Sequence, residues 1–236
     1  MNPLRRLRNK ISSIMHNIKI KLFENYINKL RDKIHLIKHK KEIKLFRNYT
    51  NKLIHLTKNI EGDIVECGVY RGYSLLIISK IVENKKINKK IFGFDSFRGF
   101  TEVSQIDNPE YAKTGKFGNT SKEGVIKILL SQKISKNFIK NNIRLIEGDF
   151  SKTLPSFKNR ISFLHLDCDL YKSYKICLKK LYPLVNKGGI IAFDEYLNDT
   201  IHYPGGQKAI NEFFKDKKHD IIHDKTINKY YYIKNE

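Results

Sequence analysis

The stretch DIVECGVYRGYS, residues 63–74, decides the fold. Its first five residues predict a strand, and the sequence YSLLIISKIVE predicts a helix over 73–83. Two glycines, Gly68 and Gly72, lie in the turn between strand and helix. Glycine lets the backbone approach a ligand closely and adopt conformations closed to other residues. The stretch therefore predicts a strand, a ligand-binding turn and a helix, which together form the first unit of an α/β domain.

The alternation of short apolar runs with helical patterns continues along the chain. The further elements expected are strands at 90–95, 143–149, 161–167 and 188–196, helices at 121–132, 171–185 and 205–216, and a closing hairpin of DIIHD and KYYYIK. Such alternation gives right-handed crossovers and a parallel sheet with helices on both faces. We therefore expect an α/β, Rossmann-like fold with a seven-stranded, mostly parallel sheet. The segment 96–120 lacks clear periodicity, which indicates a lid or substrate loop.

The charge of the chain is concentrated in its first quarter. The 236 residues carry a formal net charge of +22, and residues 1–60 hold 16 Lys and Arg against 3 Asp and Glu. A basic balance of this size is typical of proteins that bind nucleic acid or anionic membranes. Joint enrichment in Lys, Asn, Ile, Tyr and Phe also follows from AT-rich coding, so the charge does not decide the function.

Residues 1–58 show a helical pattern, in which Leu4, Leu7 and Ile11 begin an apolar stripe. We expect a basic amphipathic helical arm over 1–60 and a separate catalytic domain over 61–236. The apolar face has no Trp and few Phe, which favours packing or dimerisation over peripheral contact with an anionic membrane. Both readings stay open at this point.

Three cysteines with no paired spacing indicate a reducing compartment. The N-terminal segment has no uninterrupted apolar core and no small-residue cleavage site, and no window is apolar enough to span a bilayer. We therefore expect a cytoplasmic protein, with the inner face of the membrane as a further location if the basic arm binds lipid.

The ends of the first three strands predict the cofactor. The first turn reads E-x-G-x-x-x-G in place of G-x-G-x-x-G, and its acid, Glu66, suits a ligand with an ammonium group and no phosphate. Asp95 ends the second strand at the spacing of a ribose-binding carboxylate. Asp149 and Phe150 follow the third strand, where they would contact an adenine, although such an Asp is often a helix N-cap. Together these positions indicate S-adenosylmethionine.

Acids also follow the fourth and fifth strands. Asp167 ends the fourth, and Asp194 with Glu195 ends the fifth. Three converging carboxylates are costly unless a cation binds, and oxygen ligands select a hard ion such as Mg²⁺. Asp169 suits either capping of the next helix or support of the metal, while His165 fits a core position.

Six motifs in the same order carry a resemblance to a known family. They are GDIVECGVYRG, FGFDSFRGF, EGDF, LHLDCDLYKS, LVNKGGIIAFDEY and YPGGQKAINEFF, between about residues 61 and 216. This run resembles the macrocin-type (TylF-like) sugar O-methyltransferases, a Mg²⁺-dependent family acting on deoxysugar hydroxyls. The resemblance implies a Rossmann-like class I methyltransferase fold and places the 96–120 loop at the acceptor pocket. The family often has two aspartates where this chain has Asp194 and Glu195.

The site predicted from residues and resemblance together is as follows. Asp167 is the expected catalytic base, with Asp169 as the alternative, and the metal ligands are Asp167, Asp194 and Glu195. The cofactor-binding residues are Glu66, Gly68, Tyr70, Gly72, Ser74, Asp95, Ser96, Gly148, Asp149 and Phe150.

The expected function is methyl transfer from S-adenosylmethionine to a hydroxyl of a sugar or glycosylated acceptor, such as one used for a polysaccharide or secondary metabolite. Mg²⁺ would lower the pKa of the hydroxyl and fix its position. We expect a homodimer and no nucleic acid partner. Two alternatives remain, an RNA methyltransferase that uses the basic arm and a non-catalytic protein that binds a membrane or partner.

Overall fold

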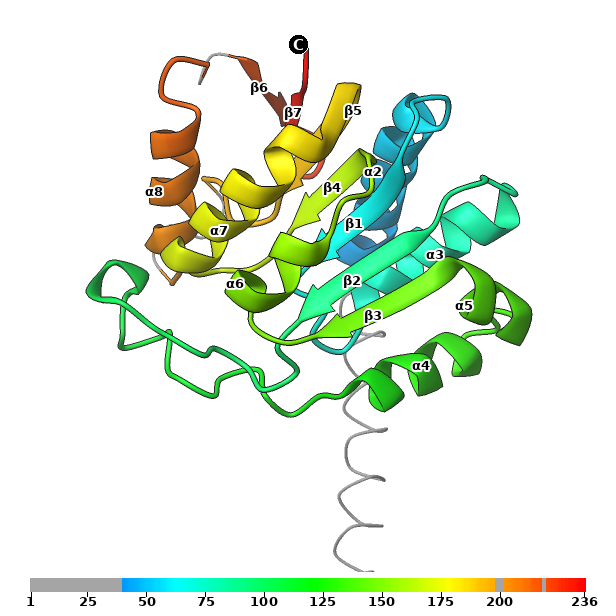
Figure 1. Cartoon of the computed structure of the whole chain (residues 1–236), viewed down its shortest axis with the longest axis horizontal. Coiled ribbons are helices and arrows are strands. Elements are labelled where there is room, and N and C mark those ends of the chain that lie inside the picture. The colour runs from blue at the N-terminus through cyan, green and yellow to red at the C-terminus, as the bar shows by residue number, and fades with distance from the viewer. Residues whose placement is uncertain (1–39, 198–201, 218–219) are drawn as a thin grey trace, which may run out of the picture. The chain divides into compact units, whose positions relative to one another are not determined.

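The computed structural model describes residues 40–197, 202–217 and 220–236 of the chain (Figure 1). It separates into a unit that ends at Phe46 and a second unit, Arg47–Glu236, which carries the sheet. The expectations for residues 1–39, namely the basic arm, its membrane contact and its dimerising stripe, lie outside the described residues. The boundary at residue 60 therefore stays a prediction. No helix in the described ranges is both long and apolar enough to cross a membrane.

A seven-stranded sheet forms the centre of the second unit. Its order is β3-β2-β1-β4-β5-β7-β6. The strands are β1 (Asp63–Cys67), β2 (Ile91–Asp95), β3 (Ile143–Glu147), β4 (Ile161–Leu166), β5 (Val185–Phe193), β6 (Ile221–Asp224) and β7 (Lys229–Ile233). The first five are parallel, and β7 runs antiparallel to both β5 and β6. The predicted mostly parallel sheet and closing hairpin are confirmed.

Helices cover both faces of the sheet, as predicted. They are α2 (Lys40–Thr57), α3 (Tyr73–Asn84), α4 (Lys122–Ser131), α5 (Lys136–Asn142), α6 (Phe150–Thr153), α7 (Tyr171–Leu181) and α8 (Pro204–Phe213), with short 3₁₀ turns η1 (Gln105–Asp107), η2 (Leu154–Ser156) and η3 (Tyr182–Leu184). In Figure 1, α6 and α7 lie in front of the sheet and α3 lies behind it. Because both faces are covered, every residue of β4 is buried.

The strand order reverses direction between β1 and β4. From β1 the chain builds outward through β2 to β3, and it then returns to place β4 on the other side of β1. In open α/β sheets, ligands bind beyond the carboxyl ends of the strands at such a reversal. The topology therefore puts the candidate site beside the ends of β1 and β4.

The boundaries near the site differ from those expected. Helix α7 ends at Leu181 rather than at residue 185, because Pro183 lies in the following 3₁₀ turn and cannot continue the helical hydrogen bonds. Strand β5 consequently begins at Val185 and ends at Phe193, so that Asp194 and Glu195 follow the strand. Helix α5 was not expected; the Ser135 hydroxyl caps it by accepting the Phe138 amide.

Candidate functional site

A cavity lies at the carboxyl ends of β1 to β4. It is lined by Gly68, Tyr70, Asp95, Ser96, Gly99, Phe100, Thr101, Glu102, Phe117, Gly148, Asp149, Phe150, Asp167, Cys168, Asp169, Leu170, Lys172, Ser173 and Ile176. Seven of the ten expected cofactor residues are among them, and Glu66, Gly72 and Ser74 are not. The segment 96–120, expected to be a lid or substrate loop, supplies six lining residues between Ser96 and Phe117.

The packing of the backbone requires glycine at position 68, directly after β1. Its φ is +90°, and a Cβ atom there would lie 1.6 Å from the main-chain oxygen of Asp167. Only glycine tolerates this close approach in this conformation. The turn after β1 and the turn after β4 therefore pack against each other and bring Asp167 to the wall of the cavity.

Asp95 holds the turn after β1 in place. Its Oδ2 accepts the amides of Val69 at 2.7 Å and Tyr70 at 2.8 Å, and its Oδ1 accepts the amide of Phe97 at 2.7 Å. A carboxylate offers about four acceptor positions. Three are thus used by the protein, which leaves less room for the two ribose hydrogen bonds expected from the sequence. Beside it, the Ser96 hydroxyl donates to the Gly99 carbonyl at 2.7 Å.

Asp149 combines the two roles considered for it. It is the N-cap of α6, because its Oδ1 accepts the Ser151 amide at 2.8 Å, and it also lines the cavity. Its Oδ2 accepts the hydroxyl of Thr101 at 3.1 Å. Burial alone raises the pKa of Asp149, but the hydrogen bonds from Ser151 and Thr101 outweigh this and lower the pKa. The carboxyl group is thus held ionised at the cavity wall.

Glu66, which the sequence predicts to contact the ammonium group of the cofactor, is not among the residues that line the cavity. The residue has no exposed surface, and its Oε1 lies 2.9 Å from Nδ1 of His165. Glu66 pairs with His165 across β1 and β4, so both side chains lie on the same face of the sheet, and both are buried. Gly72 instead begins α3 with φ +81°, and Ser74 lies in the first turn of that helix.

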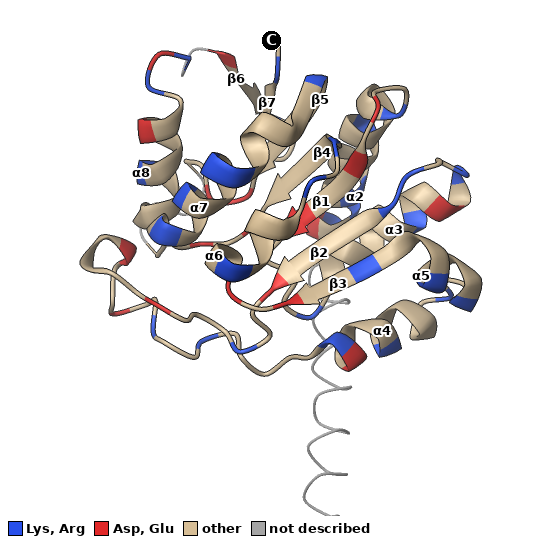
Figure 2. Cartoon of the chain, in the orientation of Figure 1, with Lys and Arg blue, Asp and Glu red and all other residues tan. Residues whose placement is uncertain are grey.

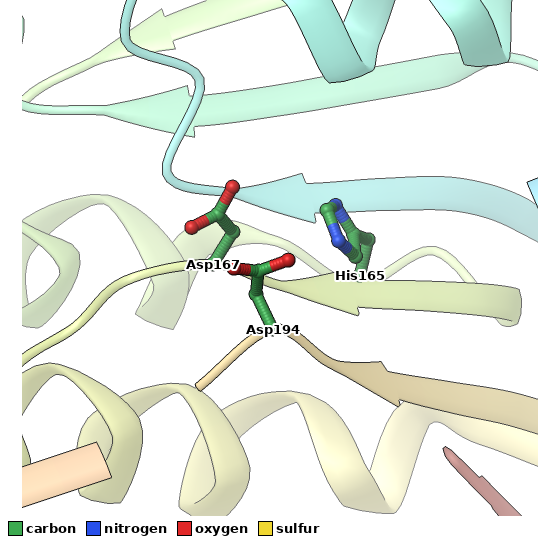
Figure 3. Close-up of side chains that lie close together, drawn as sticks. All are labelled: His165, Asp167 and Asp194. Atoms are coloured by element: carbon green, nitrogen blue, oxygen red, sulfur yellow. The ribbon is translucent and has the colours of Figure 1, made fainter. Parts of the chain in front are cut away.

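Four carboxylates gather where β4 and β5 end, and we call Asp167, Asp169, Asp194 and Glu195 the carboxylate cluster. Ligand atoms of His165, Asp167 and Asp194 lie within 4.8 Å of one another (Figure 3), as do those of Asp167, Asp169 and Glu195. In Figure 2, acidic residues also mark the tips of β2 and β3. Asp167 belongs to both groups, whereas Asp194 and Glu195 belong to one each. The three predicted metal ligands thus fall into two overlapping groups, which also include His165 and Asp169.

The carboxylates of the cluster repel one another. Burial, together with the charges of Asp194 and Glu195, raises the pKa of Asp167 well above its usual range. Burial and the charges of Asp169 and Asp194 do the same for Glu195. Tyr174 donates its hydroxyl to Glu195 Oε2, but Oε1 has no hydrogen-bond partner in the described part of the chain.

The donor set fits a hard divalent cation. The cluster offers carboxylate oxygens, which Mg²⁺, Ca²⁺ and Mn²⁺ prefer, and no thiolate belongs to either group of ligand atoms found among the described residues. The unpartnered Oε1 of Glu195 is a buried acceptor of the kind that a bound cation satisfies. The three cysteines are buried and unbonded.

Lys229 is a residue of the site that the sequence did not indicate. Its Nζ lies 2.5 Å from Asp194 Oδ1 and 3.0 Å from the Asp194 main-chain oxygen. It reaches the cluster because β7 is antiparallel to β5, so the first residue of β7 lies beside the last residues of β5. Nothing in the local sequence distinguishes Lys229 from the rest of the 46 Lys and Arg residues. Only the register of the closing hairpin would have placed it beside Asp194.

The loop 96–120 is anchored to the helices around the site. Asp107 is 1% exposed; its Oδ1 accepts the amide of Tyr171 at 2.6 Å, and its Oδ2 accepts the amide of Ser104 at 2.9 Å. Asp107 therefore supplies a carboxylate to the amino end of α7. The sequence left two roles open for Asp169, capping of α7 or support of the metal. Asp107 accepts the Tyr171 amide at the start of α7, and Asp169 lies in the carboxylate cluster.

Residues 35–228 match the family described as Macrocin-O-methyltransferase (TylF). The demethyldecarbamoylnovobiocin O-methyltransferase of Streptomyces niveus is 29% identical over 147 residues, covering 59% of this chain and 55% of the relative. A tetracenomycin 4'-O-methyltransferase of Streptomyces olivaceus, whose full name specifies a dimethoxyrhamnosyl group, is 28% identical over 168 residues, covering 66% and 63%. The chain thus spans between about half and two thirds of the length of these curated relatives.

Solved structures show the same fold. The calicheamicin methyltransferase CalS11 superposes with a TM-score of 0.67 at 23% identity, over 79% of this chain and 77% of that one. The O-methyltransferase NovP superposes with a TM-score of 0.64 at 24% identity, over 83% and 80%. The predicted class I methyltransferase fold is therefore confirmed.

Proposed function

Because the chain belongs to the macrocin O-methyltransferase (TylF) family, we propose that it transfers a methyl group from S-adenosylmethionine to a hydroxyl of a sugar or glycosylated acceptor. The observation that carries the proposal is the cavity at the strand reversal with the carboxylate cluster at its edge. Seven residues predicted to bind the cofactor line this cavity, and Asp167 belongs both to its lining and to the carboxylate cluster, which supports a metal-assisted methyl transfer.

S-adenosylmethionine would lie over the ends of β1 to β3. In this proposal Asp95 accepts from the ribose, Asp149 accepts from the adenine and Phe150 contacts its ring, while Gly68, Tyr70, Ser96 and Gly148 provide the surrounding backbone and surface. Glu66 acts through His165 and the β1–β4 pairing rather than by direct contact. Five acids against one lysine line the cavity, which suits a cofactor that carries a sulfonium and an ammonium group: Asp95, Glu102, Asp149, Asp167, Asp169 and Lys172.

Mg²⁺ would be held by Asp167, Asp194 and Glu195, and when bound it supplies a Lewis acid that lowers the pKa of an acceptor hydroxyl. Asp167 and Asp169 both line the cavity, and of these two only Asp167 belongs to both groups of ligand atoms. It is therefore placed to take the proton of the acceptor hydroxyl.

The acceptor would enter beneath the loop 96–120. Phe100 and Phe117 line the cavity with ring centroids 5.3 Å apart, and Tyr70 contacts Phe117 at 5.1 Å. Aromatic faces suit the apolar face of a sugar ring, and they exclude water from the reacting atoms. The acidic lining opposes a phosphate backbone, so we propose a small sugar-linked acceptor rather than RNA.

We keep a cytoplasmic location, a homodimer and a peripheral membrane contact as proposals. Three unbonded cysteines support a reducing compartment. The dimer and the membrane contact rest on the apolar stripe and the charge of residues 1–60. Sedimentation of the full chain, with and without anionic vesicles, tests both.

The experiment that tests the function is calorimetric titration of S-adenosylmethionine into the wild type and into Asp167→Ala, each with Mg²⁺ and with EDTA. We expect both proteins to bind the cofactor and only the wild type to bind Mg²⁺ tightly. Transfer of a labelled methyl group to a panel of deoxysugars and nucleotide-linked sugars then identifies the acceptor class.

Glu123→Gln is the matched control, because Glu123 is exposed on α4 and is not among the residues that line the cavity. This variant should bind the cofactor and Mg²⁺ as the wild type does. A folded wild type that binds no S-adenosylmethionine would contradict the proposed function.

A further inference from the structure

Lys229 reaches the carboxylate cluster from a part of the chain remote from the other site residues. It is the first residue of β7, and Tyr230 pairs with Phe193 at the end of β5. Its Nζ bonds both the Oδ1 and the main-chain oxygen of Asp194, at 2.5 Å and 3.0 Å. The Lys229 side chain is 19% exposed and that of Asp194 is 31% exposed. The ion pair is therefore shielded from solvent and fixed at two points.

The ammonium group of Lys229 acts on the whole cluster. Its Nζ lies 2.5 Å from Asp194 Oδ1, and an Asp194 oxygen lies within 4.8 Å of an Asp167 oxygen. The lysine therefore places a positive charge beside the ligand atoms of the cluster. Lys172, the lysine that lines the cavity, pairs instead with Glu102.

We propose that Lys229 is the built-in counter-ion of the carboxylate cluster and weakens its affinity for divalent cations. The inference rests on the proposed function, because it concerns the same metal site. An ammonium group bonded to one ligand repels an incoming cation, and it also offsets part of the repulsion among the carboxylates before a cation arrives. Lys229 is a positioning residue, since it touches Asp194 and lies outside the cavity lining.

The physical consequence is a site that folds without metal and exchanges it readily. A cluster with no internal cation would depend on the metal for stability, as structural metal sites do. The ammonium group of Lys229 supplies part of the electrostatic stabilisation that a bound cation would otherwise provide. The metal is then free to enter and leave with each substrate.

The test is calorimetric titration of Mg²⁺ and of Mn²⁺ into the full chain, without cofactor or acceptor. The variants are Lys229→Met, which keeps the length of the stem, and Lys229→Gln, which keeps a hydrogen-bond donor; both remove the charge. We expect each to bind the cation about tenfold more tightly than the wild type, because a nearby positive charge has been removed. We also expect both to melt at a lower temperature in EDTA.

Lys225→Met is the matched control, because it removes the same charge from an exposed lysine in the turn of the same hairpin. Its cation affinity should equal that of the wild type. A second check is Lys229→Met combined with Asp194→Asn, which should melt in EDTA at a higher temperature than Lys229→Met alone, since the uncompensated charge is gone.

Unchanged or weaker cation binding by both Lys229 variants would overturn the inference, because a merely structural lysine lowers stability without tightening the metal. Absence of binding in the wild type and in both variants would overturn it too. S-adenosylmethionine binding, measured on the same proteins, separates the two failures: intact cofactor binding and methyl transfer leave the proposed function standing.

Discussion

Buried charged side chains at the two ends of the parallel strands differ in their hydrogen bonding. At the amino end, Lys89 is 6% exposed and its Nζ donates to the carbonyl oxygens of Ile60 at 2.5 Å and Gly62 at 2.7 Å. At the carboxyl end, Glu195 is 3% exposed and its Oε1 has no hydrogen-bond partner in the part of the chain that the structure describes. The buried ammonium group is hydrogen-bonded by the fold, whereas one oxygen of the buried carboxylate has no partner among the described residues.

The difference separates structural charge from functional charge. A fold that satisfies a buried ion stabilises itself, because no polar atom is left without a partner. A fold that gathers carboxylates without satisfying them loses stability, and such groups mark sites of binding or catalysis. Changes at the amino end should therefore alter stability, and changes at the carboxyl end should alter chemistry.

The largest effect is expected from Asp167→Asn at the carboxyl end. Loss of a general base that also holds the metal should lower the rate of methyl transfer at least about 100-fold. The melting temperature of the metal-free protein should not fall, because a buried charge is removed. The transfer rate under saturating cofactor and the thermal unfolding of the same sample measure both quantities.

Asp63→Asn is the counterpart at the amino end of β1. Asp63 accepts the Lys90 amide at 3.0 Å and the Asn159 side-chain amide at 2.9 Å. Its replacement should cost about 1 kcal/mol of stability and leave the transfer rate unchanged. Equal losses of rate in the two variants would remove the distinction between the two ends.

Lys89→Met should have the next largest effect, this time on stability. Two buried carbonyl oxygens would lose their donor, at a cost of about 2–4 kcal/mol in the free energy of unfolding. The rate of methyl transfer per folded molecule should stay the same, because Lys89 is absent from the cavity lining. Urea unfolding with a parallel activity assay measures the two; a rate that fell with unchanged stability would contradict the expectation.

The contribution of the carboxylate cluster to the stability of the metal-free protein should fall as the pH rises above about 4. The pKa values of Asp167 and Glu195 are raised in the folded state, so these groups contribute stability below their unfolded pKa of about 4 and lose it as the pH rises through the folded values. Mg²⁺ should oppose the loss, and its affinity should rise with pH because it competes with protons.

Glu195→Gln sharpens this expectation. The variant should flatten the pH dependence and raise the metal-free stability at pH 8 by about 1 kcal/mol, since an uncompensated buried charge is gone. Thermal unfolding in EDTA at several pH values measures it. A wild-type melting temperature that climbed from pH 5 to 8 in EDTA would show that the carboxylates are not strained.

The smallest effect is expected from Lys52→Ala. Lys52 Nζ lies 2.9 Å from Asp224 Oδ2, but the lysine side chain is 50% exposed, so the ion pair contributes about 0.5 kcal/mol. Burial raises the pKa of Asp224 but the Lys52 hydrogen bond outweighs it, so the small contribution exists above the unfolded pKa and disappears as the pH falls. Cation affinity should not change, in contrast to Lys229→Met.

The sequence by itself determined the succession of strands and helices and the acids that follow each strand. Alternating short β-rich runs and amphipathic helices admit few topologies, because crossovers are right-handed and parallel strands need both faces covered. The carboxyl ends of parallel strands then share one edge, so Asp95, Asp149 and Asp167 were assigned to the same cavity.

Tertiary structure alone decided which charges meet. Glu66 turns into the core toward His165, Asp107 leaves its loop to bond the amide of Tyr171, and Lys229 crosses from the last hairpin to Asp194. The partners in these contacts lie between 35 and 99 residues apart. The local sequence pattern does not predict such contacts, because strand register and the path of each loop depend on packing across the whole sheet.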